Sequence, residues 1–256
     1  YENKLKIKTR ICFVVTKAGR EALVAYNKRL RAQMHALEVL AEAERPLSGE
    51  ELASVQVSAA TLRILCEKGW SERSEQRVLR NSYANRTELK ESLHLTDEQR
   101  QAVEAIGSAI TEPHQETFLL QGITGSGKTE VYLRAAAQAM EAGKQVLLLV
   151  PEIALTAQIV KRFQAWFGDE VAVAHSKLSQ NERADVWYKM RTNSAKLLIG
   201  VRSAVFAPFS DLGLIIIDEE HESSYKQDER PNYHARTVAL KRAQLSGIPV
   251  VLGSAT

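Results

Sequence analysis

The sequence predicts an α/β fold, with a parallel sheet between two layers of helices, preceded by a smaller α+β module. Two observations carry this prediction. From about residue 95 onward, short apolar runs alternate with helical stretches, and such two-sided runs suit strands buried in a parallel sheet. The composition, with 45% hydrophobic and 25% charged residues, is that of an ordinary globular protein and argues against disorder.

The elements of the larger region follow in order along the chain. The expected strands cover residues 118–120, 146–150, 171–174, 197–199, 214–217 and 250–252. The expected helices cover residues 97–110, 128–142, 155–167, 181–191 and 234–245. Strand–helix–strand connections of this kind are right-handed, so the strands should lie parallel.

The N-terminal segment is basic. Apolar and basic residues alternate over 4–11, which predicts a strand with a face formed by Lys4, Lys6, Lys8 and Arg10. The chain has 34 basic and 31 acidic residues, and its excess positive charge lies in residues 1–31. This basic face either attracts DNA without regard to base sequence or is a solvated strand edge.

Residues 32–85 predict a winged-helix-like module. A helical pattern over 33–43 ends at Pro46, Ser48 and Ser58 are positioned as helix N-caps, and an extended segment covers 70–83. A generic three-helix interaction domain fits this order equally well. The last helix carries only Arg63 and Lys68 as cations, which gives little support for reading a DNA major groove. We divide the chain into an arm (1–31), this module (32–85), a polar linker (86–94) and the α/β region (95–256).

A phosphate-binding loop pattern, G-x-x-x-x-G-K-[ST], follows the first strand of the α/β region. Its members are Gly122, Ile123, Thr124, Gly125, Ser126, Gly127, Lys128 and Thr129. Glycines in such a loop present backbone N–H groups to phosphate oxygens at a helix N-terminus. Lys128 is then expected to contact the β- and γ-phosphates of ATP, and the Thr129 hydroxyl to bind Mg²⁺. The competing interpretation is a glycine-rich turn with a surface lysine.

An acidic pair follows the Ile-rich strand at 214–217. Asp218 is placed to hold Mg²⁺, and Glu219 to orient and deprotonate the attacking water. Acidic pairs are often only solvated turns. The phosphate loop elsewhere in the same fold favours the nucleotide interpretation, which requires Asp218 and Glu219 to lie on the same side of the sheet as Lys128.

These motifs resemble the DExH helicases of superfamily 2, with Asp218, Glu219, Glu220 and His221 as the acidic box. Gln99 resembles the adenine-sensing glutamine of that class, and residues 151–158, 200–206 and 253–256 resemble its motifs Ia, Ib and III. The segments 221–227 and 233–236, with 175–183, are similar to the PriA-type primosomal replication-restart helicases. The resemblance is strong over 95–256 and weak over 33–80.

The resemblance implies a RecA-like helicase lobe 1 (a P-loop NTPase lobe), an ATP- and Mg²⁺-dependent 3′ to 5′ DNA helicase activity, and assembly of the primosome at stalled or abandoned forks. Its partners would be single-stranded and forked DNA, single-strand-binding protein and helicase-loading proteins. Catalytic roles fall to Lys128, Asp218, Glu219 and His221. The expected DNA-binding or coupling residues are Thr156, Gln158, Arg202, Ser203, Tyr225, Lys226, Arg230, Tyr233, Arg236, Ser254 and Thr256.

Among these, Tyr225 and Tyr233 are expected to stack on bases beside cationic side chains. Alternatively, both are half-buried packing residues. We also expect an excised piece of a longer monomeric protein, because the chain starts at Tyr1 and stops at the third motif. A second lobe would supply an arginine finger, and any zinc would bind in the missing C-terminal part, so the piece itself should be weakly active or inactive.

Two other function classes compete with a replication-restart helicase. One is another translocase of the RecG-like or restriction type, which shares the phosphate loop and the acidic box. The other is a non-enzymatic, nucleotide-gated adaptor. Two cysteines cannot form a disulfide framework and no apolar run is long enough to span a membrane, so we expect a cytoplasmic, nucleoid-associated bacterial protein.

Overall fold

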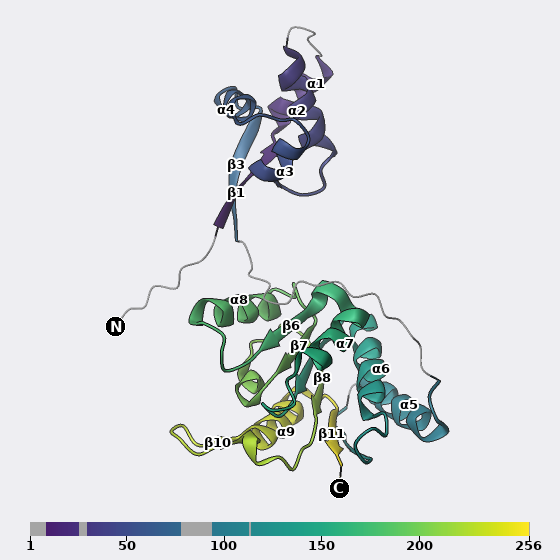
Figure 1. Ribbon diagram of the computed structural model, residues 1–256. Helices are drawn as coiled ribbons and strands as arrows, with labels where there is room; N and C mark the ends of the chain where they lie inside the picture. The colour runs from purple at the N-terminus through teal and green to yellow at the C-terminus, as the bar shows by residue number, and fades with distance from the viewer. Residues whose placement is uncertain (1–8, 26–29, 78–93, 113, 256) are drawn as a thin grey trace. The chain divides into compact units, whose positions relative to one another are not determined.

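The computed structural model (Figure 1) describes residues 9–25, 30–77, 94–112 and 114–255. The chain divides into two compact units, Tyr1–Arg80 and Asn81–Thr256, which are described separately. Among the helices in the described ranges, none is long and apolar enough to cross a lipid bilayer. The calls on Lys4, Lys6 and Lys8 and on the linker at 86–93 lie outside the described residues.

The first unit is an α+β module around a three-stranded antiparallel sheet with the order β2-β1-β3. Its strands are β1 (Thr9–Val15), β2 (Leu47–Ser48) and β3 (Ser71–Arg77), and its helices are α1 (Lys17–Val24), α2 (Arg31–Glu42), α3 (Gly49–Ser54) and α4 (Ala59–Glu67). The expected boundary at residue 31 is wrong, because β1 is the central strand of this sheet. The alternation at 4–11 therefore leads into a strand of the module, and not into a separate arm.

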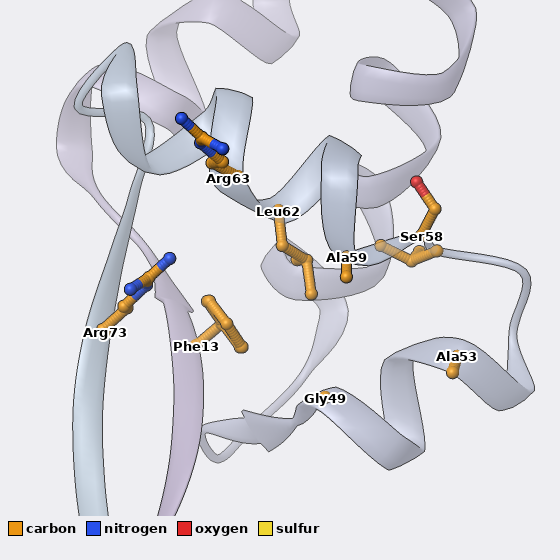
Figure 2. A pocket seen from close by; sticks show the side chains of 9 residues that line it. Phe13, Gly49, Ala53, Ser58, Ala59, Leu62, Arg63 and Arg73 are labelled. Atoms are coloured by element: carbon orange, nitrogen blue, oxygen red, sulfur yellow. The ribbon is translucent and has the colours of Figure 1, made fainter.

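Local capping explains where the helices of this unit begin. The Ser48 hydroxyl accepts from the Glu51 backbone N–H while the Glu51 carboxylate accepts from the Ser48 N–H, which forms a capping box at α3. At α4 the Ser58 hydroxyl caps the helix by accepting from the Thr61 backbone N–H. Buried apolar side chains, including Phe13, Leu37 and Leu62, form the core beneath these helices. A pocket of about 250 Å³ opens beside Phe13 and Leu62, with Arg63 and Arg73 in its lining (Figure 2).

The second unit is built on a six-stranded sheet with the order β4-β11-β8-β5-β7-β6, whose neighbouring strands are all parallel. Its strands are β4 (Thr117–Gln121), β5 (Gln145–Leu149), β6 (Val171–Ala174), β7 (Leu197–Gly200), β8 (Leu212–Ile217) and β11 (Val250–Ser254). All six predicted strands are confirmed, and the RecA-like parallel architecture with them. A short hairpin, β9 (Lys226–Gln227) with β10 (Tyr233–His234), lies outside this sheet.

Helices cover both faces of the sheet (Figure 1). Helices α5 (Asp97–Thr111), α6 (Lys128–Glu141) and α7 (Ala157–Phe167) pack against one face, and α8 (Gln180–Arg191) and α9 (Ala235–Ser246) against the other. Alternate residues of one strand therefore enter different cores: Val146 and Leu148 belong to one core, and Leu147 and Leu149 to the other. The inner strands are buried on both sides, which is why they appear in the sequence as continuous apolar runs, whereas the edge strand β4 is partly exposed.

Candidate functional site

The carboxyl ends of the parallel strands gather the predicted motifs along one edge of the sheet. The phosphate loop follows β4, Asp218 follows β8, and Ala255 follows β11. On the other half of the same edge, residues 150–156 follow β5 and residues 201–206 follow β7. Ligands of open α/β sheets bind outside these carboxyl ends. The topology therefore separates a phosphate-loop half from a half formed by the Ia-like and Ib-like segments.

The phosphate loop has the backbone geometry that its glycines permit. Gly125 and Gly127 have φ values of +86° and +87°, in the left-handed region that side chains disfavour. Gly127 is also crowded, because a Cβ there would lie 2.4 Å from the Gln99 amide nitrogen. Gln99 caps α5 through Thr96 and donates to the Ser126 carbonyl at 2.9 Å, so its amide holds the loop against the start of that helix.

The phosphate loop and the acidic box lie together. The Lys128 ammonium donates to the Gly122 carbonyl and lies 3.5 Å from Glu219 Oε1. The Lys128 side chain is only 9% exposed and that of Glu219 27%, so this ion pair is largely shielded from water. The competing interpretation of a glycine-rich turn with a surface lysine does not fit this geometry.

The acidic strand end is held from both neighbouring strands. The Asp218 N–H donates to the Leu149 carbonyl at 2.9 Å, and the Glu220 N–H to the Gly253 carbonyl at 2.8 Å. Between them, Glu219 has a φ of +45°, a conformation that non-glycine residues rarely adopt. Backbone strain of this kind is often retained at functional sites, where the surrounding contacts enforce it. The bonds to β5 and β11 supply that enforcement here.

The Glu219 carboxylate also contacts residues 253–256, the segment that resembles motif III. Its Oε2 accepts from the Ala255 N–H at 3.2 Å and lies 3.9 Å from His221 Nε2. The other ring nitrogen of His221 is 3.4 Å from the Ser254 hydroxyl. These contacts place Glu219, His221 and Ser254 in one cluster, whereas Thr256 lies outside the described residues.

Tyr132 is a site residue that the sequence interpretation missed. Its side chain is 1% exposed, and its hydroxyl donates to Asp218 Oδ1 at 2.9 Å. Burial raises the pKa of the Asp218 carboxyl above its usual range, and the hydrogen bond from Tyr132 acts in the opposite direction. Burial likewise raises the pKa of Tyr132, so its hydroxyl keeps its proton as the donor. The apolar periodicity of α6 gives no hint of this contact, because Tyr132 looks like one more core residue.

Tyr225 is buried rather than exposed. Its side chain is 1% exposed, and its hydroxyl donates to the Asp218 backbone carbonyl at 2.6 Å. The expectation of an exposed base-stacking tyrosine is therefore wrong, and the alternative of a packing residue is correct for Tyr225. Tyr233 is half-buried and packs edge-on against the half-exposed Phe206, with ring centroids 4.9 Å apart.

Arg202 and two cations of residues 221–236, here called the aromatic-rich segment, already have protein partners. Arg202 donates to the carbonyls of Ser224 and Lys226, which ties the turn after β7 to this segment. Lys226 pairs with Asp228 at 2.8 Å between Nζ and Oδ1, and Arg236 pairs with Glu220. These arginine contacts organise the segment from within, and only Lys226 and Arg230 are well exposed among its predicted cations.

The remaining predicted DNA contacts lie at the same edge, in the turn after β7 and at the start of α7. Gln158 and Ser203 are exposed, and Thr156 is the N-cap of α7. A pocket of about 210 Å³ lies between the segments that follow β5, β6 and β7. Its lining includes Glu152, Ser176, Arg202, Ser203 and Tyr233.

The oxygen donors present fit magnesium. Mg²⁺ commonly binds one or two protein oxygens and completes its shell with water and substrate phosphates. The Thr129 hydroxyl and the Asp218 carboxylate are donors of this type. Within the described residues, no cluster of three or more His, Cys, Asp or Glu side chains is arranged to hold a metal by itself.

Comparison with known proteins agrees with this geometry. Replication restart protein PriA of Bacillus subtilis (strain 168) is 46% identical over 237 residues, and PriA of Haemophilus influenzae 39% identical over 247 residues. These matches cover 92% and 94% of this chain but only 29% and 33% of the relatives, so the chain spans about a third of their length. A solved structure of RecG bound to a three-way DNA junction matches 64% of this chain and 21% of that chain, with 26% identity and a TM-score of 0.50.

The family assignment rests on the larger unit. Residues 96–256 match the DEAD/DEAH box helicase family, a range that contains the phosphate loop, the acidic box and the third motif. This range is more than half of the chain. The protein therefore belongs to the DEAD/DEAH box helicase family and is similar to the PriA replication restart proteins.

Proposed function

We propose that this chain is the first ATPase lobe, with its preceding winged-helix-like module, of a DNA helicase that acts in replication restart. The single observation that carries the proposal is the convergence of Lys128 and Glu219, 3.5 Å apart, at the carboxyl edge of the sheet. A phosphate-binding lysine and a carboxylate that can activate water are the two groups that ATP hydrolysis needs together. The similarity to PriA proteins supports replication restart as the process.

The phosphate loop binds and orients the nucleotide. Backbone N–H groups of residues 122–128 and the N-terminus of α6 offer donors to phosphate oxygens, and Lys128 offers a positive charge. Thr129 and Asp218 hold Mg²⁺, which when bound neutralises charge on the β- and γ-phosphates. Gln99 is positioned beside the loop through its bond to Ser126, which is compatible with a role near the adenine.

Glu219 is the general base in this proposal. Its strained backbone and its bonds to Ala255 and Lys128 fix the carboxylate before substrate arrives, which limits reorganisation during reaction. The carboxylate accepts a proton from the attacking water as the water oxygen attacks the γ-phosphorus and the bond to the β-phosphate bridging oxygen breaks. His221 and Ser254 link this carboxylate to the end of β11.

DNA binding is assigned to the other half of the edge. Exposed side chains at Gln158, Ser203, Lys226 and Arg230, with Thr156 at the start of α7, suit contacts to phosphates, which hold a strand without reading its sequence. Arg202 donates a hydrogen bond to the Ser224 carbonyl of the aromatic-rich segment. The Tyr225 hydroxyl of the same segment donates to the Asp218 backbone carbonyl. This chain of contacts gives a physical route by which DNA engagement alters the metal-binding strand end.

The direction, the coupling and the partners follow the family resemblance. We infer 3′ to 5′ movement on single-stranded or forked DNA, stimulated by DNA and supported by single-strand-binding and primosome proteins. An arginine supplied by a second lobe contributes about 10³ to 10⁵ in rate in related phosphoryl-transfer systems. The 256-residue chain alone should therefore bind Mg-nucleotide weakly and hydrolyse it at most slowly.

The test uses the full-length protein. ATP turnover is measured with and without forked DNA, and strand separation is measured on duplexes with a 3′ or a 5′ single-stranded tail. The proposal predicts DNA-stimulated turnover, separation that requires the 3′ tail, and loss of both in Lys128→Ala. DNA-stimulated turnover without strand separation would indicate a translocase of another type. ATP turnover that persists unchanged in Lys128→Ala would overturn the assignment of the site.

A further inference from the structure

Tyr132 connects the helix of the phosphate loop to the acidic strand end. It lies on α6, three residues after Thr129 and four after Lys128, so its position is fixed by the same helix that carries those two residues. Its hydroxyl donates to Asp218 Oδ1 at 2.9 Å, and its ring belongs to the buried core beneath the sheet. One rigid element therefore carries the phosphate loop lysine, the hydroxyl of Thr129 and a donor to the acidic side chain.

Gly253 on β11 provides the space that this contact needs. A Cβ built on Gly253 would lie 1.7 Å from the Tyr132 hydroxyl oxygen and 3.0 Å from its Cζ. Gly253 is not among the residues with positive φ, so its backbone conformation does not demand glycine. The requirement for glycine at this position therefore comes mainly from the hydroxyl of Tyr132, with Asp218 Oδ1 at 3.2 Å from the same Cβ.

The main chain and the side chain of Asp218 are held by different groups. The backbone is fixed by the bond to Leu149 and by the bond from the Tyr225 hydroxyl to the Asp218 carbonyl. Those bonds do not fix the carboxylate itself, which accepts from the Glu219 backbone N–H and, at Oδ1, from the Tyr132 hydroxyl, the side-chain donor that orients it. Hydrogen bonds to the oxygens of a metal-binding carboxylate orient it and raise the affinity of the site.

We propose that Tyr132 is a positioning residue for Asp218, and that Gly253 is present to admit its hydroxyl beside the metal-binding carboxylate. This inference rests on the proposed role of Asp218 in binding Mg²⁺. It adds a specific connection between the phosphate-loop helix and the third motif, because a shift of β11 at Gly253 moves the tyrosine that orients Asp218.

The first test is Tyr132→Phe in the full-length protein, a change that keeps the buried ring and removes the donor. Binding of a fluorescent ADP analogue is measured over a Mg²⁺ titration, and thermal unfolding is measured without Mg²⁺. The inference predicts that the Mg²⁺ concentration at half-saturation rises about 10- to 100-fold, the usual effect of losing such a partner. A Mg²⁺ midpoint equal to that of the wild type would overturn it, whatever the change in thermal stability.

The second test uses the crowding at Gly253. Gly253→Ala should displace the tyrosine. The Mg²⁺ concentration at half-saturation should then rise at least as much as it does in Tyr132→Phe. In the double variant the clash with the hydroxyl oxygen is gone, and the alanine Cβ keeps only the contacts of 3.0 Å to the ring Cζ and 3.2 Å to Asp218 Oδ1, so we expect an Mg²⁺ midpoint close to that of Tyr132→Phe alone. If the defect of Gly253→Ala instead adds in full to that of Tyr132→Phe, Gly253 acts independently and the inference is wrong.

Lys128→Ala separates this inference from the proposed function. If Lys128→Ala binds the ADP analogue as the wild type does at every Mg²⁺ concentration, the nucleotide site itself is misplaced and both proposals fail. If Lys128→Ala loses binding while Tyr132→Phe matches the wild type, the nucleotide site stands and only the positioning role of Tyr132 is wrong.

Discussion

Shielded ion pairs are found in the second unit among the described residues, although that unit also has exposed pairs such as Lys226 with Asp228. In the first unit, Arg63 and Glu67 form an ion pair whose side chains are 75% and 60% exposed. In the second unit, the pair of Lys128 and Glu219 is 9% and 27% exposed. Exposed pairs contribute little to stability, whereas shielded ones act strongly on each other and on a ligand. The difference arises from topology, because parallel strands bring their carboxyl ends together and the small antiparallel sheet does not.

The largest effect should come from the acidic box. Glu219→Gln in the full-length protein removes the proposed base while keeping the side-chain shape, and should lower DNA-stimulated ATP turnover about 10³-fold or more, within the range of losses seen for key catalytic groups. Steady-state turnover checks this. Glu67→Gln, the matched change in the exposed pair of the first unit, should leave turnover unchanged. An equal loss of ATP turnover in Glu219→Gln and Glu67→Gln would contradict the proposed difference between the two units.

A buried ion network gives the next effect. Glu130 is 4% exposed and accepts from Arg134 and Arg162, which are themselves 29% and 40% exposed. Glu130→Gln should destabilise the second unit by about 2 kcal/mol, less than for a fully buried pair because water reaches the arginines. Hydrogen exchange resolved along the chain would locate the loss. Destabilisation of the first unit instead would contradict this account.

The contact of Tyr225 with Asp218 should affect coupling more than folding. Tyr225→Phe keeps the buried ring and removes the hydroxyl, and we expect the ratio of DNA-stimulated to unstimulated ATP turnover to fall about tenfold. Tyr225→Ala is a poor test, because it would leave a cavity that costs about 3 to 5 kcal/mol. Lys226→Ala, on the exposed side of the same segment, should weaken DNA stimulation by removing a phosphate contact. An unchanged stimulation ratio in Tyr225→Phe would remove the route through Asp218.

The smallest effects belong to the caps of the first unit. Ser48→Ala should destabilise that unit by about 1 kcal/mol through loss of the capping box, with no change in nucleotide binding. Chain-resolved hydrogen exchange and binding of the fluorescent ADP analogue test the two parts of this expectation. A change in nucleotide affinity would show that the units are less independent than their separate cores indicate.

Acid should act on the first unit through the same capping box. Hydrogen bonds from Arg45 and Ser48 lower the pKa of Glu51 from 4.5 to about 2. Because the folded-state pKa is depressed, this stabilisation is present above about pH 4.5 and is lost as the pH falls toward 2. Glu51→Gln should flatten this part of the pH dependence of unfolding. A pH profile identical to that of the wild type would assign the acid sensitivity to other groups.

The sequence predicted the strands and the phosphate loop because each has a local signature. A strand buried on both faces appears as a short apolar run, and the glycines at 125 and 127 occupy conformations that only a turn of this type requires. The same local logic placed Asp218 and Glu219 at a strand end. Their distance to Lys128 was an inference from topology, which the parallel sheet supports.

The errors concern contacts made across the sequence. The pairing of β1 with β3 joins residues 9–15 to residues 71–77, and no local sequence pattern predicts which strands will pair. Tyr225 lies among charged and polar residues, which suggested exposure, yet its ring fills a core formed by distant helices and strands. For Tyr132 the sequence predicts burial correctly but not the hydrogen-bond partner, since an apolar helix face does not show where a tyrosine hydroxyl points.

The most direct test of the central claim is a crystal structure of the full-length protein with ADP, Mg²⁺ and a γ-phosphate mimic. Our account predicts the mimic beside the Lys128 ammonium, the metal bound by Thr129 and Asp218, and the Glu219 carboxylate facing the position of the attacking water. A nucleotide bound elsewhere on the molecule, or a metal without contact to Asp218, would contradict it.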